Sequence, residues 1–450
     1  MQLSRREFAA GALGAVVAAP LRAAQPLRAV PRLEPTIEAI RAYGEAHRAY
    51  FGLPGMTLGL ALPGAPATVL DFGYSEVEAR RPISPDTLFQ IGSISKSMTA
   101  AVIHQLAAEG RFGLTDRASA LLPGLPLPAG NRITVQNLLD HVSGLPDSAP
   151  LSAAGGLWVG YAPGAHWSYS NTGYDILGLL AEHFGGKPLA QLFGERIFAP
   201  LGMQRTRGAI VSADRLLYAQ GYGQADPSIP FIPGQPLAPA AWIDSTSGAG
   251  SVASTADDMT RFLRALAGAA EGRGGLGLSP AAASAFASHA VPSDTPGMRY
   301  GNGLMHVVHG GRPYLHHTGG MVSFSSSFHL DAARGVGAFA STTISAFAEY
   351  RPRLLTQFAV EALTNALAGR PLPAPPSLAV RLPQPAVYAG EYRGPSGGFE
   401  IRGGDPLTLV AGGRSAPLLP IGGDLFRTTH PAFRAFTLKV ERTNRAITGA

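Results

Sequence analysis

Strand-like segments lie near both ends of the main part of this chain, and helix-like segments lie between them. Residues 56–62 and 67–73 are strand-like runs on either side of Pro63-Gly64, which predicts a hairpin. Four later runs predict an antiparallel meander, at residues 303–309, 314–317, 323–330 and 336–343. We therefore expect an α+β fold, in which an antiparallel sheet built from both chain ends is flanked by helices and accompanied by a helical subdomain.

The segments between and beside the strands carry helix signals. Helices are expected at residues 34–51, 135–141, 171–184, 189–198 and 352–367. A capping box of Thr255 and Asp258 predicts the start of one more helix, which continues to Leu266. By contrast, residues 221–250 are rich in Pro and Gly and too irregular for core elements, so they predict a long loop beside the functional site.

The two ends of the chain lie outside this domain. Residues 1–25 combine Arg5-Arg6 with an apolar run that is too short to span a bilayer, which predicts a removable twin-arginine export signal. We therefore expect an exported, periplasmic protein with no transmembrane anchor in its mature form. The main domain is expected over residues 30–368, a Pro-rich linker over 369–384 and a small β-rich module over 385–450.

Composition excludes several classes of function. The 450 residues are 46% hydrophobic and 15% charged, so the chain can bury a large core. The net charge of +6 is carried by single arginines rather than by basic runs, which argues against a nucleic-acid partner. The chain has no cysteine, which excludes disulfides, thiol catalysis and cysteine-bound metals. We expect neither a metal nor another cofactor.

A serine and a lysine three residues apart precede a helix-forming segment. Residues three apart on a helix share one face, so the side chains of Ser93 and Lys96 are expected to meet. Lysine is rare here, with Lys187 and Lys439 the only others. A desolvated lysine can accept a proton, whereas arginine cannot. The spacing predicts a serine nucleophile activated by Lys96, at a first helical turn whose backbone N–H groups can face an oxyanion.

Two later segments carry further candidates for the same cleft. Tyr169 and Asn171 are two residues apart, so both side chains can point the same way from an extended segment, with the phenol near Ser93 and Lys96. His317, Thr318 and Gly319 lie on a predicted strand that ends in glycines, against which a substrate can lie. The backbone N–H groups of Ser93 and Gly320 would then form an oxyanion hole.

These motifs, in this order, resemble the serine β-lactamase and penicillin-recognising enzyme family. The pattern is Ser93-x-x-Lys96, then Tyr169-x-Asn171, then His317-Thr318-Gly319, and it is similar to the class C-like branch with its DD-peptidases, D-aminopeptidases and carboxylesterases. The resemblance implies an acyl-enzyme on Ser93, with Lys96 and Tyr169 moving protons, although it leaves open which takes the first one. It also implies that Asn171 holds Lys96 or a substrate amide.

One position departs from the β-lactamases of that branch. They usually carry a lysine where this chain has His317, and its charge helps to bind the antibiotic's carboxylate. A neutral histidine does this poorly at pH 7. The resemblance therefore implies a hydrolase of a small ester, amide or peptide, of carboxylesterase or D-amino-acid peptidase type, that is a poor β-lactamase. The alternative is a catalytically weak, penicillin-binding-like protein that recognises cell wall.

Two other patterns suggest different chemistry. The residues Gly394-Pro395-Ser396-Gly397-Gly398 match a nucleophile elbow, but the proline and glycines argue against the strand, turn and helix that this motif needs. His306, His309, His316 and His317 could form a metal site. Positions two and three apart on different strands rarely converge without a carboxylate, so this interpretation is weak.

Overall fold

The structure is a computed structural model, and it describes residues 33–125, 127, 132–151, 156–344, 350, 352–394, 397–443 and 446–449. The export signal predicted over residues 1–25 lies outside the described residues, as does Ser396 of the alternative nucleophile motif. No helix in the described part of the chain is long and apolar enough to cross a membrane.

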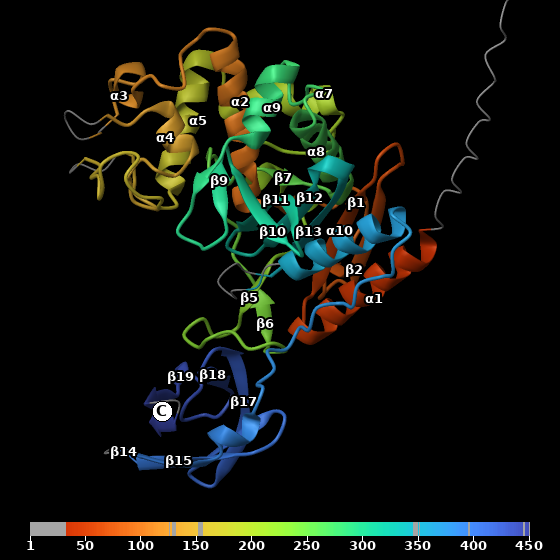
Figure 1. Ribbon diagram of the computed structural model, residues 1–450, viewed down its shortest axis with the longest axis vertical. Coiled ribbons are helices and arrows are strands. Elements are labelled where there is room, and N and C mark those ends of the chain that lie inside the picture. Colours follow the sequence, from red (N-terminus) through yellow and green to blue (C-terminus); the bar gives the residue numbers. More distant parts are fainter. Residues whose placement is uncertain are drawn as a thin grey trace, which may run out of the picture.

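A nine-stranded antiparallel sheet forms the centre of the main domain (Figure 1). In spatial order its strands are β3 (Arg81–Pro82), β2 (Thr68–Glu76), β1 (Gly55–Ala61), β13 (Val336–Thr342), β12 (Ser325–Asp331), β11 (Arg312–Gly320), β10 (Leu304–His309), β9 (Arg299–Gly301) and β8 (Val291–Pro292). The two ends of the domain meet where β1 pairs with β13, with Met56 opposite Thr342. The predicted α+β class, with one sheet shared by both chain ends, is confirmed.

Helices cover both faces of this sheet (Figure 1). Helices α1 (Glu34–Phe51) and α10 (Arg353–Leu367) pack on one face, and α8 (Ala256–Ala270), followed by α9 (Pro280–Ser288), packs on the other. All seven residues of β1 are therefore buried. Helix α8 approaches β1 closely at Gly59, where a Cβ atom would lie 2.6 Å from the carbonyl oxygen of Ala256. Only glycine lets α8 lie this close to β1.

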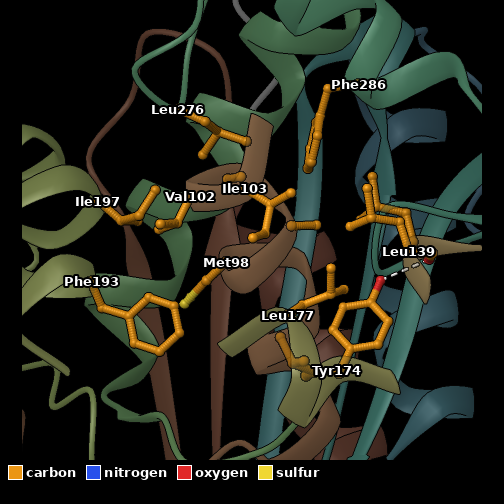
Figure 2. Close-up of a cluster of buried hydrophobic side chains, with 14 of the residues drawn as sticks. Met98, Val102, Ile103, Leu139, Tyr174, Leu177, Phe193, Ile197, Leu276 and Phe286 are labelled. Carbon is orange, nitrogen blue, oxygen red and sulfur yellow. Dashed lines mark hydrogen bonds between the residues drawn. The ribbon is translucent and has the colours of Figure 1, made fainter. Parts of the chain in front are cut away.

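A helical subdomain lies beyond the sheet (Figure 1). It contains α2 (Ser95–Ala108), α3 (Ala118–Leu121), α4 (Val135–Leu139), α5 (Asn171–Gly185), α6 (Leu189–Phe193), the π-helical turn η2 (Gly194–Phe198) and α7 (Ala199–Leu201). Helix α2 is buried on almost every side. Figure 2 shows Met98, Val102 and Ile103 of α2 among side chains from several other elements, including Leu177 and Phe286.

The burial of α2 fixes the segment that begins just before it. Each of its fully buried large apolar side chains contributes roughly 1.5–3 kcal/mol relative to exposure. Close by, the Tyr174 hydroxyl donates a hydrogen bond of 2.9 Å to the carbonyl oxygen of Leu139, which ties α5 to the end of α4 (Figure 2). A rigid α2 holds both Ser93, in the turn η1 (Gly92–Ile94), and Lys96 in place.

Two sequence-based details differ from the structure. At the start of α8, the Thr255 hydroxyl accepts from the N–H of Asp258 at 3.2 Å, but the Asp258 carboxylate accepts from the N–H of Arg205 and the hydroxyl of Thr206. The capping box is therefore only half formed, because residues distant in sequence compete for its carboxylate. The long loop of residues 221–250 also contains a short hairpin, made by β5 (Tyr222–Gln224) and β6 (Leu237–Pro239).

Short elements complete the main domain. They are β4 (Phe89–Gln90), which pairs with β7 (Ala253–Ser254), and the 3-10 turns η3 (Ser212–Leu217) and η4 (Ala332–Arg334). Strand β4 lies directly before η1 in sequence, so its pairing with β7 sets the direction in which the chain enters the Ser93 turn.

The C-terminal residues build a second sheet with its own hydrophobic core. After the turn η6 (Pro385–Tyr388) come β14 (Gly390–Gly394), β15 (Gly397–Arg402), β16 (Leu407–Ala411), β17 (Arg414–Gly422), β18 (Leu425–Thr428) and β19 (Leu438–Lys439), then the hairpin of β20 (Glu441–Thr443) and β21 (Ala446–Gly449). We call this part the C-terminal module. The segment before it runs along α1, where the Tyr43 hydroxyl donates to the carbonyl oxygen of Pro376 at 2.9 Å.

Buried histidines make the fold sensitive to acid. Burial lowers the pKa of His47 to about 4, below its ordinary value of 6.5. The unfolded chain therefore binds a proton at this residue below about pH 6.5, whereas the native state does so only near pH 4. The stability that the neutral His47 contributes to the fold is lost as pH falls between these two values. We expect this histidine alone to reduce the free energy of unfolding by on the order of 1–2 kcal/mol between pH 7 and pH 5.

Urea unfolding at the two pH values measures this loss. A His47→Phe variant lacks the titrating group, so its free energy of unfolding should fall less than that of the unaltered protein. His166→Phe, which changes an exposed histidine, serves as the matched control. Identical pH dependence in all three proteins would contradict the assignment.

Candidate active site

The turn before α2 holds the Ser93 backbone against the end of β11. Gly92 has a left-handed φ of 53°, and a Cβ atom there would lie 2.7 Å from the backbone nitrogen of Gly320. Both the conformation and the close approach require glycine. The carbonyl oxygen of the preceding Ile91 accepts from the Ser326 hydroxyl at 2.8 Å, which ties the turn to β12. The Ser93 side chain itself is half-buried.

Lys96 is completely buried beneath Ser93 and makes three polar contacts. Its Nζ lies 3.0 Å from Ser93 Oγ, 2.7 Å from Asn171 Oδ1 and 2.8 Å from the carbonyl oxygen of Ala249. The Asn171 amide is oriented by its Nδ2, which donates to the Asp147 carboxylate at 3.0 Å. The Asn171 Oδ1 and the Ala249 carbonyl oxygen can therefore only accept hydrogen bonds from Nζ. A neutral amine donates its two hydrogens to them and keeps its lone pair for the Ser93 hydroxyl.

The surroundings also favour this neutral form. Burial lowers the pKa of Lys96 from 10.5 to about 7, even though the carboxylates of Asp175 and Asp147 pull the pKa upward. Near pH 7 a substantial fraction of the protein then carries an unprotonated amine next to the hydroxyl. This is the protonation state that a general base requires.

A second set of contacts positions the carbonyl group that Lys96 uses. The Ser247 hydroxyl donates to the Asp175 carboxylate at 2.5 Å, and it accepts from the N–H of Ala249 at 2.9 Å. These contacts and Asp147 were not identified from the sequence. They join α5 to residues 247–249, far apart in the chain, and no local spacing signals them.

Tyr169 lies beside the buried amine. Nζ of Lys96 is 4.8 Å from the centroid of the Tyr169 ring. On its other side the phenol ring packs against His141, with the centroids 4.3 Å apart. The His141 Nδ1 accepts from the N–H of Ser170 at 3.2 Å, which holds the chain between Tyr169 and α5. The structure thus brings Tyr169, Lys96 and Ser93 to one place, and it adds His141 as the support of the phenol.

The end of β11 lies directly against the Ser93 turn. A Cβ atom at Gly319 would be 1.8 Å from the carbonyl oxygen of Ile91, so this glycine is required by the packing of the turn on the strand. From the sequence we expected this glycine to make room for a substrate, whereas in the structure its packing against Ile91 requires it. Thr318 and Gly320, on either side of it in the chain, are half-buried.

The N–H of Gly320 points away from the neighbouring strand β12. Met321 N donates to the carbonyl oxygen of Phe324 at 2.9 Å, which makes these two a hydrogen-bonded pair. The next pair, Gly320 and Ser325, is then a non-hydrogen-bonded pair, whose N–H groups face outward. Gly92 of the Ser93 turn lies next to this backbone, since a Cβ atom there would be 2.7 Å from the Gly320 nitrogen. The Gly320 N–H therefore takes no part in the ladder between β11 and β12, and an oxyanion donor must be free in this way.

His317 is buried and satisfied within the protein. Its Nδ1 lies 2.6 Å from the Thr318 carbonyl oxygen, which can only accept, so Nδ1 carries the hydrogen. Its Nε2 then accepts from the Tyr300 hydroxyl at 3.1 Å. Burial, followed by the charge of Lys96, lowers the pKa of His317 to about 3. The ring is neutral near pH 7 and provides no fixed positive charge.

With this geometry described, comparison with known proteins identifies the family. Residues 40–360, most of the chain, match the beta-lactamase family. The chain belongs to the β-lactamase family. It is 32% identical over 220 residues to a penicillin-binding protein of Bacillus subtilis (strain 168), covering 43% of this chain and 48% of the relative. A beta-lactamase of Pseudomonas fluorescens is also 32% identical, over 178 residues, covering 37% of this chain and 50% of the relative. The chain therefore aligns with about half the length of these relatives.

Solved structures of the same fold cover more of the chain. An octameric penicillin-binding protein homologue from Pyrococcus abyssi covers 91% of this chain and 94% of its own, with a TM-score of 0.68 and 23% identity. A D-amino acid amidase from Ochrobactrum anthropi SV3 covers 73% of this chain and 99% of its own, with a TM-score of 0.62 and 27% identity. The first resemblance shows the fold only, whereas the second also bears on the proposal below.

The histidine-rich strands of this β-lactamase-family protein do not form a metal centre within the described residues. No group of three or more His, Cys, Asp or Glu side chains there is arranged to hold a metal ion. Instead His316 stacks on His329, with ring centroids 4.0 Å apart, and its Nδ1 lies 2.6 Å from the carbonyl oxygen of Phe328. The alternative metal interpretation has no geometric support in this part of the chain.

The environment of Lys96 gives a test of its role as a base. Arginine keeps the positive charge but cannot accept a proton, so we expect Lys96→Arg to lower kcat/KM for a p-nitrophenyl ester by roughly 10³-fold or more. For the unaltered protein, kcat/KM should rise as pH passes about 7, because the amine loses its proton there. Lys187→Arg, at an exposed lysine paired with Glu195, is the matched control. Retained turnover in Lys96→Arg would contradict this role.

Proposed function

We propose that this protein is an exported serine hydrolase that cleaves a small ester or amide through an acyl-enzyme on Ser93. The observation that carries the proposal is the 3.0 Å contact between Ser93 Oγ and a fully buried amine, whose pKa is lowered to about 7. An exposed serine and lysine on one helical turn would have neither the burial nor the two acceptor groups that direct the lone pair. Export is supported by the pattern of residues 1–25.

In the first step the Ser93 hydroxyl proton passes to Nζ of Lys96 while Oγ attacks the substrate carbonyl carbon. The carbonyl oxygen becomes an oxyanion, which the N–H groups of Ser93 and Gly320 stabilise. Asn171 and the Ala249 carbonyl group accept hydrogen bonds from the resulting ammonium without moving, because they already accept from the neutral amine. The site therefore needs little reorganisation when the charge appears.

Collapse of the intermediate breaks the bond to the alcohol or amine, which leaves with a proton. Lys96 is the source of that proton, and Tyr169, whose ring lies beside Nζ, is positioned to relay it. A water molecule then attacks the Ser93 ester, with the same groups removing its proton, and releases the acid. In this second half, Lys96 and Tyr169 carry out the proton transfers of the first half in reverse.

The substrate we propose is a carboxylic ester or the amide of a small D-amino acid. The D-amino acid amidase, which is 27% identical, supports the amide, since the match covers 99% of the amidase chain. The neutral, internally bonded His317 argues against a β-lactam, because the site lacks a fixed cation there to bind a carboxylate. We propose His317, Thr318 and Gly319 as the strand along which the substrate lies.

Active-site labelling tests the proposal. We expect a fluorophosphonate to label the purified protein at Ser93, and we expect hydrolysis of p-nitrophenyl esters or D-amino-acid amides. Ser93→Ala should abolish labelling and lower kcat by at least about 10³-fold. Nitrocefin should be hydrolysed at least a hundredfold more slowly than the best ester or amide.

A half-buried serine beside Tyr169 provides the control. Ser168→Ala should keep both labelling and turnover. If the protein binds a labelled penicillin reversibly but neither it nor a fluorophosphonate forms a covalent bond, the cell-wall recognition alternative replaces the hydrolase. Efficient nitrocefin turnover would contradict the proposed substrate class.

A further inference from the structure

A pocket of about 560 Å³ lies between the main domain and the C-terminal module. One wall is the loop that joins and surrounds β5 and β6, including Gly223 and residues 227–231. A second wall is Val322, and the third is formed by Arg427 and Ala435 of the module. Figure 1 shows β5 and β6 between the large sheet and the module. Neither part of the protein forms this pocket alone.

One wall of the pocket lies close to the candidate active site. Val322 follows the oxyanion-hole residue Gly320 by two positions, and two residues of extended chain span at most roughly 7 Å. The β5 end of the loop is attached at the same place: a Cβ atom at Gly221 would lie 2.2 Å from Cβ of Ser323. The pocket wall at Val322 is thus within reach of a substrate whose carbonyl oxygen binds the Gly320 N–H.

The loop that forms the first wall is held at two points. The N–H of Tyr222 donates to the carbonyl oxygen of Thr343 at 2.8 Å, just after β13. In the middle of the loop, Nη1 of Arg427 donates to the carbonyl oxygen of Phe231 at 3.0 Å, and the Phe231 side chain is buried in the core. The pocket is therefore a fixed feature of the folded chain. The C-terminal module helps to determine its shape.

The lining of the pocket indicates what it binds. Most of the lining residues have apolar side chains, among them Ile229, Pro230 and Val322, although Gln224, Ser228 and Arg427 add polar groups. We propose that the pocket binds a hydrophobic arm of the substrate, an alkyl or aryl chain that extends away from the scissile carbonyl group. This inference rests on the proposed serine hydrolase activity and specifies its substrate class. Each additional CH₂ group that enters such a pocket should raise kcat/KM about fourfold.

A pocket-filling substitution tests the inference. A Cβ atom at Gly223 meets no heavy atom within 4 Å, and its φ is not left-handed, so Gly223→Leu adds a side chain at the pocket wall without a clash. Gly403→Leu is the matched control, because Gly403 is equally open but lies in an exposed turn between β15 and β16. Each protein is assayed with two ester series, which lengthen either the acyl chain or the alcohol chain from two to eight carbons.

We expect the unaltered protein to prefer long chains in at least one series, and the responding series identifies the arm that enters the pocket. Gly223→Leu should lower kcat/KM for the eight-carbon substrate at least tenfold while leaving the two-carbon substrate within twofold. Unchanged short-chain turnover also shows that the variant is folded. Gly403→Leu should match the unaltered protein throughout.

Two results would overturn the inference, and they differ in what else they affect. If the unaltered protein hydrolyses the two-carbon esters with no chain-length preference, or if Gly223→Leu does not change that preference, the pocket is a solvent-filled gap and the hydrolase proposal stands. If the unaltered protein hydrolyses none of the esters and also resists fluorophosphonate labelling, both proposals fail.

Discussion

Exclusion of water from the amine of Lys96 is the condition on which the rest of the site depends. A lysine in water has a pKa of about 10.4, so it is protonated at pH 7 and cannot act as a base there. Here α2 packs against α5, α6 and α9, and the turn η1 that precedes it packs on β11, which removes the amine from solvent. The Asn171 amide and the Ala249 carbonyl group replace the lost water with two acceptors. They orient the remaining lone pair toward Ser93.

The packing of the sheet against the segment around Ser93 and Lys96 satisfies this condition. The sheet brings the end of β11 against the Ser93 turn, and glycines at positions 92 and 319 allow a separation that no side chain would permit. The strand register turns the Gly320 N–H away from β12 and leaves it available as the proposed oxyanion donor. The proposed base, nucleophile and oxyanion donors are therefore positioned by packing between a helix and a strand rather than by long loops. Loops and the C-terminal module are left to shape the space beyond.

Local patterns predicted the elements of the fold, and three-residue spacing predicted the Ser93 and Lys96 contact, because both depend on neighbours in sequence. The predicted helix over residues 34–51 coincides with α1. What the sequence did not reveal was long-range. Asp175 and Ser247 meet across 72 positions, and Tyr300 reaches His317 from another strand. Single carboxylates and tyrosines occur throughout the chain, so nothing in their own surroundings distinguishes them. The half-formed capping box at Thr255 failed for the same reason.

The central claim is that the amine of Lys96 is largely neutral near pH 7. Titration of the lysine side chains by ¹³C NMR measures this directly, and the presence of only three lysines makes each signal assignable, with Lys96→Arg removing one. The account requires that the signal lost in this variant titrates in the unaltered protein with a pKa near 7. A pKa close to the ordinary value of 10.5 would contradict it, because Lys96 would then be a fixed cation rather than a base.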